Sequence, residues 1–200
     1  MINKKIKYHS KNFMNLVKKI SDTIDTKNIE LLALDLFKIK KNKGRIFFLG
    51  VGGSAANSSH AVNDFRKLCE IECYSPVDNV SELTARINDD GWNSSFSNWL
   101  KLSKLNSKDA IFIMSVGGGN LKKRVSINLI QAIKFAKKKH AKIYGIVGRD
   151  GGFTKKQGHK VIVVPPLDKN LITPQTESFQ AIIWHCLVSH PILQSKKTKW

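Results

Sequence analysis

The chain has 200 residues, of which 42% are hydrophobic and 24% are charged. This composition is typical of a folded globular domain and excludes a disordered or fibrous protein. The apolar runs are shorter than the roughly 18 to 20 residues that a membrane-spanning helix needs, so we expect no membrane partner. The basic N-terminus lacks the apolar segment and cleavage site of a secretory signal. Three scattered cysteines form neither a disulfide framework nor a CxxC metal motif. We therefore expect a reduced, cytoplasmic protein.

The charge is strongly unbalanced. Lys and Arg number 34 against 15 Asp and Glu, which gives a formal net charge of +19. Only five of the basic residues are Arg, the residue type that binds phosphates and bases in a bidentate fashion. The lysines are spread along the chain and are not interleaved with aromatic residues that could stack on bases. We therefore expect a solvated basic surface and no dedicated nucleic-acid partner.

Hydrophobic periodicity predicts an alternating order of helices and strands. Residues 1–43 have apolar positions at helical spacing. Apolar runs bounded by turns predict strands at 45–50, 110–115, 142–147 and 160–164, with a weaker one at 72–75. Amphipathic stretches between them predict helices at 54–68, 93–104, 126–138 and 175–190. Continuously apolar strands that alternate with helices are typical of a parallel sheet covered on both faces.

The predicted fold is therefore a three-layer, doubly wound α/β domain with a helical N-terminal extension. We expect one domain over residues 1–200, with N-terminal helices at 1–43, an α/β core at 44–191 and a basic tail at 192–200. Such sheets bind ligands beyond the carboxyl ends of their strands, so the segments that follow the predicted strands are the candidate site.

The first of these segments, residues 50–54 with the sequence GVGGS, follows a strand and opens a helix. Glycines allow close backbone approach, and the helix N-terminus offers free N–H groups to an anion, so the segment predicts a phosphate site. A tight turn without a ligand is the alternative. The string also approximates a dinucleotide fingerprint, but Glu70 and Glu72 lie where the chain enters the second predicted strand and not at its end.

The second segment, residues 115–120 with the sequence SVGGGN, follows the strand at 110–115. Three consecutive glycines are costly in conformational entropy, which favours a backbone nest for an anion or a sugar over a flexible turn. The third segment, residues 148–152 with the sequence GRDGG, is equally compatible with a turn, and we assign it no role.

Two pairs of ionisable residues lie at helical spacing. His60 and Asp64 are four residues apart and share a helix face, and Glu177 and His185 are eight residues apart on the last helix, beside a predicted apolar stripe. That stripe consists of Phe179, Ile182, Ile183, Cys186 and Leu187. Thr173 and Pro174 are suited to the N-cap and first position of this helix. Either pair alone could be an ordinary pair on a helix surface, or its histidine could be a hydrogen-bonded core residue. The nearby glycine loops favour a functional site instead.

These residues resemble the sugar isomerase (SIS) domain family, and within it the phosphoheptose isomerases, from about residue 12 to residue 191. Residues 50–66, GVGGSAANSSHAVNDFR, are similar to the family's GNGGS…H…E stretch, residues 88–91 to its NDxG motif, and residues 176–190 to its Q-E-x-H…H helix. The resemblance implies conversion of sedoheptulose 7-phosphate to D-glycero-D-manno-heptose 7-phosphate through an enediolate, for surface-polysaccharide heptose synthesis. It also implies a cytoplasmic homotetramer.

The resemblance further implies a role for individual residues. Asp64 and His185 stand at the positions of the catalytic carboxylate and histidine. The substrate-binding set is Val51, Gly52, Gly53, Ser54, Asn88, Asp89, Ser115, Val116, Gly117, Asn120 and Glu177. A Zn²⁺ site of the family corresponds to His60, Asp64, Glu177 and His185, which offer two imidazoles and two carboxylates.

The chain departs from the family pattern at several of these positions. Val51 replaces an asparagine, Asp64 a glutamate and Glu177 a glutamine, and a Ser/Thr-rich phosphate loop has become SVGGGN followed by extra residues at 121–127. Asp is one methylene shorter than Glu, and a displacement of about 1 Å can cost on the order of 10²-fold in rate. The chain thus either compensates through its backbone or acts on a different phosphosugar.

Two other functions remain open. A non-catalytic SIS protein, acting as a phosphosugar sensor or a protein-binding adaptor, would keep the glycine loops without needing Asp64 and His185. A nucleotide-dependent enzyme would use the GVGGSA segment to bind NAD(P), which a titration tests.

Overall fold

The structure is a computed structural model and describes residues 8–197 of the chain. Its strands are β1 (Ile46–Leu49), β2 (Cys73–Tyr74), β3 (Ala110–Ser115), β4 (Lys142–Val147) and β5 (Lys160–Val163). Its helices are α2 (His9–Thr23), α3 (Thr26–Lys41), α4 (Gly53–Cys69), α5 (Val80–Asp90), α6 (Ser95–Leu102), α7 (Ile127–Lys138), α8 (Gly152–Gln157) and α9 (Ile172–Val188). Among the described residues, no helix has the length and apolarity to cross a membrane.

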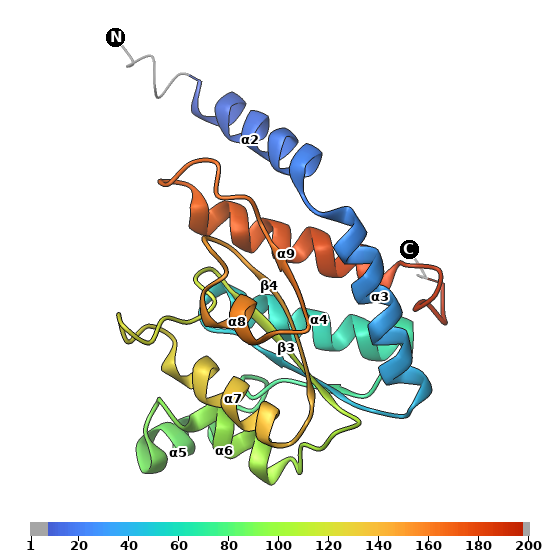
Figure 1. Cartoon of the computed structure of the whole chain (residues 1–200), viewed down its shortest axis with the longest axis vertical. Helices are drawn as coiled ribbons and strands as arrows, with labels where there is room; N and C mark the ends of the chain where they lie inside the picture. The colour runs from blue at the N-terminus through green and yellow to red at the C-terminus, as the bar shows by residue number, and fades with distance from the viewer. Residues whose placement is uncertain (1–7, 198–200) are drawn as a thin grey trace.

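The five strands form one parallel sheet in the order β2-β1-β3-β4-β5, as Figure 1 shows in part. Successive side chains of each strand point to opposite faces, and both faces are buried. Phe48 and Phe112 belong to the core under α3, α4 and α9, whereas Phe47 and Ile111 belong to the core under α6 and α7. The predicted three-layer, doubly wound α/β fold is therefore confirmed.

The N-terminal helices differ in their relation to this core. α2 buries only Ile20 and extends from the body of the molecule (Figure 1). α3 instead packs against β5 and α9, and Leu32, Ala33 and Leu36 are fully buried there. α3 is thus one of the layers that cover the sheet, so the helical extension proper is shorter than the predicted 1–43.

The structure corrects three local predictions. α5 and α8 were not expected, because α5 buries none of its residues and α8 is short and begins with glycine. α9 begins at Ile172, so Thr173 and Pro174 lie inside its first turn and do not cap it. On the same helix, Ile182 and Cys186 are exposed and do not belong to the core stripe.

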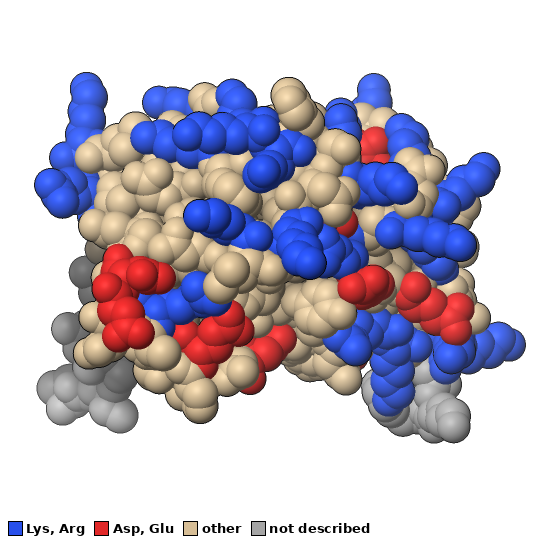
Figure 2. Space-filling model, turned by 90° about the horizontal axis from the view of Figure 1, so that it is seen from below, with Lys and Arg blue, Asp and Glu red and all other residues tan. Residues whose placement is uncertain are grey.

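The basic side chains are spread over the surface and the acidic ones are clustered. Figure 2 views the molecule from below Figure 1; Lys and Arg are distributed across this face, and carboxylates gather in a few patches. Residues 110–167 contain 12 Lys and Arg but only one acidic residue, Asp150. This segment, which runs from β3 through α8 and β5, carries a net charge of +11 out of the total of +19.

Candidate functional site

The sheet order places two of the glycine loops at one point. The chain leaves β1 toward β2 on one side and reaches β3 on the other, so the strand order reverses between β1 and β3. Ligands of doubly wound sheets bind at such a switch point, beyond the carboxyl ends of the strands. Residues 50–53 follow β1 and residues 116–119 follow β3, so both predicted loops lie at this edge.

The first loop is shaped by glycine. A β-carbon on Gly50 would lie 2.2 Å from the carbonyl oxygen of Ser54, so the tight turn into α4 excludes any other residue there. Gly52 has a φ of 64°, in the left-handed region that favours glycine. Val51, Gly52 and Gly53 are exposed, as a ligand-binding loop requires, whereas Ser54 is only 1% exposed.

Glu177 lies over this first loop. α4 and α9 pack side by side, and Asn57 on α4 donates hydrogen bonds to the Glu177 carbonyl and to Oε1 of Gln180, each at 3.0 Å. A β-carbon on Gly53 would lie 2.6 Å from Oε2 of Glu177, so a side chain there would displace this carboxylate from its position. The negative carboxylate thus occupies the positive N-terminal end of α4. A phosphate would therefore bind more favourably at the second glycine loop, residues 115–120, than at the first.

The second and third loops pack against each other through their backbones. The Gly118 carbonyl accepts hydrogen bonds from the N–H and Oγ1 of Thr154, and the Gly119 carbonyl accepts one from the N–H of Phe153. A β-carbon on Gly118 would lie 2.1 Å from the Gly151 carbonyl oxygen. The glycines of the second loop are therefore needed for close packing against the third loop. The third loop, to which we assigned no role, supports the second one.

Several donors near the second loop are free. The Oγ of Ser115 accepts a hydrogen bond from the Gly118 N–H at 3.1 Å, which fixes the loop. Within residues 8–197, the Gly117 N–H has no hydrogen-bond acceptor, and the side chain of the N-cap residue Ser126 does not cap α7, whose Leu129 N–H is bonded to Oδ1 of Asn128. Asn120 is exposed at the base of a short hairpin that a bridge to Val125 closes. Free N–H groups at a helix N-terminus are suited to an anion.

His60, Asp64 and His185 form one cluster on the adjoining faces of α4 and α9. One nitrogen or oxygen from each residue lies within 4.8 Å of the others. Nε2 of His60 is 3.8 Å from Oδ2 of Asp64, and the other Asp64 oxygen accepts a hydrogen bond from Nδ2 of Asn63 at 2.8 Å. Asp64 is buried, and both histidines are exposed. The cluster therefore presents two imidazoles beside a carboxylate at the surface of the molecule.

The chemistry of this cluster fits a divalent metal ion. Nδ1 of His185 donates to the Ala181 carbonyl at 2.8 Å, which leaves Nε2 with its lone pair available to a metal or a proton. Two imidazole nitrogens and one carboxylate oxygen are a ligand set typical of Zn²⁺. Glu177 is not part of this group in the described structure, because it lies eight residues, or about 12 Å, along α9 from His185.

Trp184 is a residue of this site that the sequence did not single out. Its side chain is fully buried, and its ring centre lies 4.7 Å from that of His60 and 3.5 Å from that of His185. The two histidine rings meet edge-on at 5.5 Å. The indole thus holds both imidazoles in place, and only its position next to His185 in the sequence could have indicated this.

The structure does not bring Asn88 and Asp89 to the cluster. Both are exposed in the last turn of α5, where Nδ2 of Asn88 donates to Oδ1 of Asp89 at 2.8 Å. α5 packs against α6, and Leu83 contacts the core on the face of the sheet opposite to α4 and α9. Their contact with a sugar remains a prediction.

The cysteines of α4 and α9 do not supply a thiolate to the cluster. Cys69 is the last residue of α4, and burial raises the pKa of its thiol to about 12. Desolvation also raises the pKa of the Cys186 thiol, which follows His185 on α9. Both remain protonated at neutral pH, so the chemistry of the site rests on imidazoles and carboxylates.

Comparison with known proteins places this sequence and fold in a family. The sequence profile of the SIS domain matches residues 8–148. Phosphoheptose isomerase of Buchnera aphidicola subsp. Schizaphis graminum is 30% identical over 142 residues, covering 69% of this chain and 70% of that protein. Phosphoheptose isomerase of a Nitratiruptor species is 29% identical over 193 residues, covering 94% and 95%.

A solved structure shows the same fold. Phosphoheptose isomerase GmhA from Neisseria gonorrhoeae superposes with a TM-score of 0.79 at 22% identity, covering 94% of this chain and 97% of that one. The likeness in fold and the match to the domain profile agree. The chain belongs to the SIS domain family.

Proposed function

We propose that the chain is a sugar-phosphate isomerase that converts sedoheptulose 7-phosphate to D-glycero-D-manno-heptose 7-phosphate. The observation that carries the proposal is the cluster of His60, Asp64 and His185 on helices that also border the glycine loops. Relatives named phosphoheptose isomerase support the choice of sugar. The homotetramer, the cytoplasmic location and the role in surface-polysaccharide synthesis remain predictions from the resemblance.

In the proposed reaction, Asp64 is the base. It removes a proton from C1 of the ketose, and the electron pair moves to the C2 carbonyl oxygen to give an enediolate. His185 carries a proton from O1 to O2 through its available Nε2, and protonated Asp64 returns its proton to C2, which yields the aldose. The buried position of Asp64 excludes water from this carboxylate, and Asn63 fixes one of its oxygens.

Anion binding and a metal ion would complete the site. The free N–H groups at Gly117 and at the N-terminus of α7 would hold the phosphate, and this remote anchor would align the sugar for proton transfer. His60, Asp64 and His185 are the residues that would hold Zn²⁺, whose chemistry there would be to stabilise the enediolate oxygen. Because Nδ1 of His185 is bonded to the Ala181 carbonyl, its Nε2 would either bind the metal or carry the proton, and the assay with and without Zn²⁺ distinguishes these two roles.

The test is an isomerase assay on the full chain with a panel of ketose phosphates, with and without added Zn²⁺. We expect turnover of sedoheptulose 7-phosphate, and we expect Asp64→Asn and His185→Ala each to lower kcat by at least about 10²-fold. Asp22→Asn on α2 and His140→Ala after α7 are matched controls on exposed residues and should leave kcat unchanged.

Two results would contradict the proposal in different ways. Full activity of both site variants would show that another pair of groups moves the protons. A chain that turns over none of the ketose phosphates, but binds one and then recruits a protein partner, would be a phosphosugar sensor or adaptor.

A further inference from the structure

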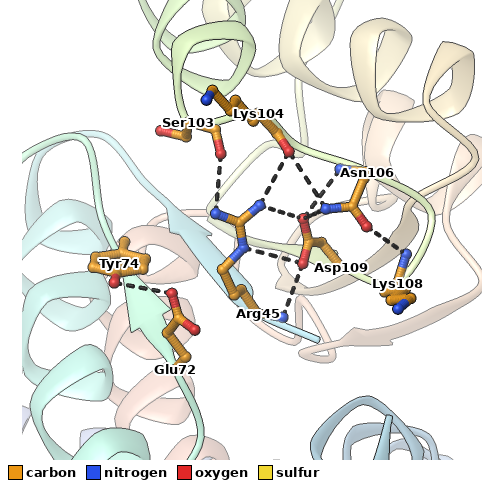
Figure 3. A network of polar contacts seen from close by, with 8 residues as sticks. All are labelled: Arg45, Glu72, Tyr74, Ser103, Lys104, Asn106, Lys108 and Asp109. Carbon is orange, nitrogen blue, oxygen red and sulfur yellow. Dashed lines mark hydrogen bonds and ion pairs between the residues drawn. The ribbon is translucent and has the colours of Figure 1, made fainter. Parts of the chain in front are cut away.

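Arginine is rare in this chain, and three of the five arginines have structural partners. Arg45 forms an ion pair with Asp109 at 2.8 Å and donates to the carbonyls of Ser103 and Lys104 (Figure 3). Arg86 pairs with Glu82 at 2.6 Å. Arg66 donates to the Cys73 carbonyl and lies over the ring of Tyr74. Arg45 and Arg66 thus join separate segments of the chain, and Arg86 is paired within α5.

The other two, Arg124 and Arg149, flank the second glycine loop and have no such partner. Neither side chain forms a hydrogen bond or an ion pair within residues 8–197. Both are exposed, and they lie in the segment that carries most of the positive charge. An unpaired guanidinium at the edge of an anion-binding loop has its donors available for a ligand.

The backbone at these positions is also unusual. Seven residues other than glycine have a positive φ, and four of them (Lys43, Glu70, Lys104 and His140) end helices, where this conformation is common. The remaining three are Arg124, Ser126 and Arg149, with φ of 52°, 52° and 51°; the first two follow the second loop in the sequence, and Arg149 lies beside Gly117. Such conformations cluster at ligand-binding sites, where the surrounding structure maintains them.

Arg149 is the better placed of the two arginines. A β-carbon on Gly117 would lie 3.9 Å from Cδ of Arg149, so the arginine stem lies beside a loop residue whose N–H has no hydrogen-bond acceptor within residues 8–197. Its neighbours are fixed on both sides: Gly148 donates to the Val116 carbonyl, and Gly152 donates to Asp150. Arg124 lies instead in the exposed hairpin beyond Asn120.

We propose that Arg149 is an anion-binding residue of this site and that its guanidinium binds the phosphate of the sugar substrate beside Gly117. This inference rests on the proposed function and adds to it the group that neutralises the phosphate. The position of Glu177 supports it, because that carboxylate lies at the first loop and disfavours a phosphate there. The dianion would be held by a bidentate guanidinium, the Gly117 N–H and the N-terminus of α7.

The test measures binding of inorganic phosphate to the full-length protein by isothermal titration calorimetry. Arg149→Gln should weaken binding by at least about 10-fold, and Arg149→Lys, which keeps the charge without the fork, should weaken it less. Lys138→Gln removes the same charge from the other end of α7 and is the matched control, with an expected change of less than about 2-fold. In the isomerase assay, Arg149→Gln should raise KM by about 10-fold and change kcat less.

The outcomes separate this inference from the proposed function. Equal phosphate affinity of the wild type and Arg149→Gln, or an equal loss in Lys138→Gln, would overturn the role of Arg149 even if the wild type is an active isomerase. Failure of the wild type to bind phosphate or to turn over any ketose phosphate would overturn both. Because Arg149 is exposed, its variants should melt at the wild-type temperature, and Arg149→Lys tests the inference should Arg149→Gln not fold.

Discussion

Glu177 places a negative charge over the N-terminus of α4, at a position where the resembling family has glutamine. The carboxylate complements the helix dipole, and such an interaction stabilises by about 0.3–1 kcal/mol. The same charge repels a phosphorylated substrate that approaches the adjacent loops. Glu177 therefore stabilises the folded chain but weakens the binding of a phosphorylated substrate.

We predict that Glu177→Gln lowers KM for sedoheptulose 7-phosphate by a few-fold and lowers the free energy of unfolding by at most about 1 kcal/mol. The reason is that glutamine keeps the shape of the side chain and removes its charge. Steady-state kinetics and thermal unfolding measure the two effects. Asp22→Asn, which removes one negative charge on α2, should change neither, and a higher KM in Glu177→Gln would show that the carboxylate itself binds the sugar.

At this scale, helical spacing predicted part of the site. The four-residue spacing of His60 and Asp64 predicted a shared face, and the structure confirms it. The eight-residue spacing of Glu177 and His185 also keeps one face, but it separates the two side chains along the axis, so one compact site of four ligands does not form in the described chain. A contact between two helices, such as that of Trp184 on α9 with His60 on α4, depends on how the helices pack. The spacing of residues along the sequence does not specify that packing.

At the scale of elements, the central strands were the most predictable part. β3 and β4 have the predicted bounds, because strands buried on both faces need an uninterrupted apolar run. α5 was missed for the opposite reason, since a helix without buried residues leaves no apolar stripe in the sequence. The packing of the second loop on the third was also not predictable, because adjacent strands bring together segments more than 30 residues apart.

Asp109 connects the starts of β1 and β3 with the segment that follows α6, at the end of the strands opposite to the candidate site. It is 1% exposed, and its carboxylate accepts hydrogen bonds from the backbone and side chain of Arg45, at the start of β1, and from the backbone and side chain of Asn106. Arg45 in turn binds carbonyls that follow α6 (Figure 3). The side-chain hydrogen bond to Asp109 raises the pKa of the Arg45 guanidinium, so the guanidinium remains charged at any ordinary pH.

We predict that Asp109→Ala lowers the free energy of unfolding by about 3 kcal/mol, because it leaves a partly buried guanidinium and several N–H groups without an acceptor. Asp109→Asn, which keeps one acceptor oxygen, should cost less. Urea denaturation followed by circular dichroism measures both, with Asp22→Ala as a control of small effect. A loss below about 1 kcal/mol in Asp109→Ala would show that water replaces the carboxylate and that the network does not hold β1 to α6.

At the scale of the whole molecule, the charge is uneven in a way that matters for an anionic substrate. The segment 110–167, with 12 basic residues and one acidic residue, includes both the second and the third loop. Lys122 and Lys123 in the hairpin and Lys155 and Lys156 on α8 are exposed at this end of the sheet, where they create a positive potential. The lysines at the end of α7 and at the starts of β4 and β5 lie at the opposite end, so only part of the lysine excess lies near the proposed phosphate site.

We predict that kcat/KM for a sugar phosphate falls several-fold when the ionic strength rises from about 0.01 M to about 0.15 M, whereas kcat at saturating substrate changes little. Over this range the Debye length shortens from about 30 Å to about 8 Å, so the distant lysines cease to attract the substrate while contacts inside the site persist. Assays in a series of NaCl concentrations at constant pH measure both constants. A parallel loss of kcat would indicate that salt disturbs the site itself, and a constant kcat/KM would show that the lysines play no part in substrate capture.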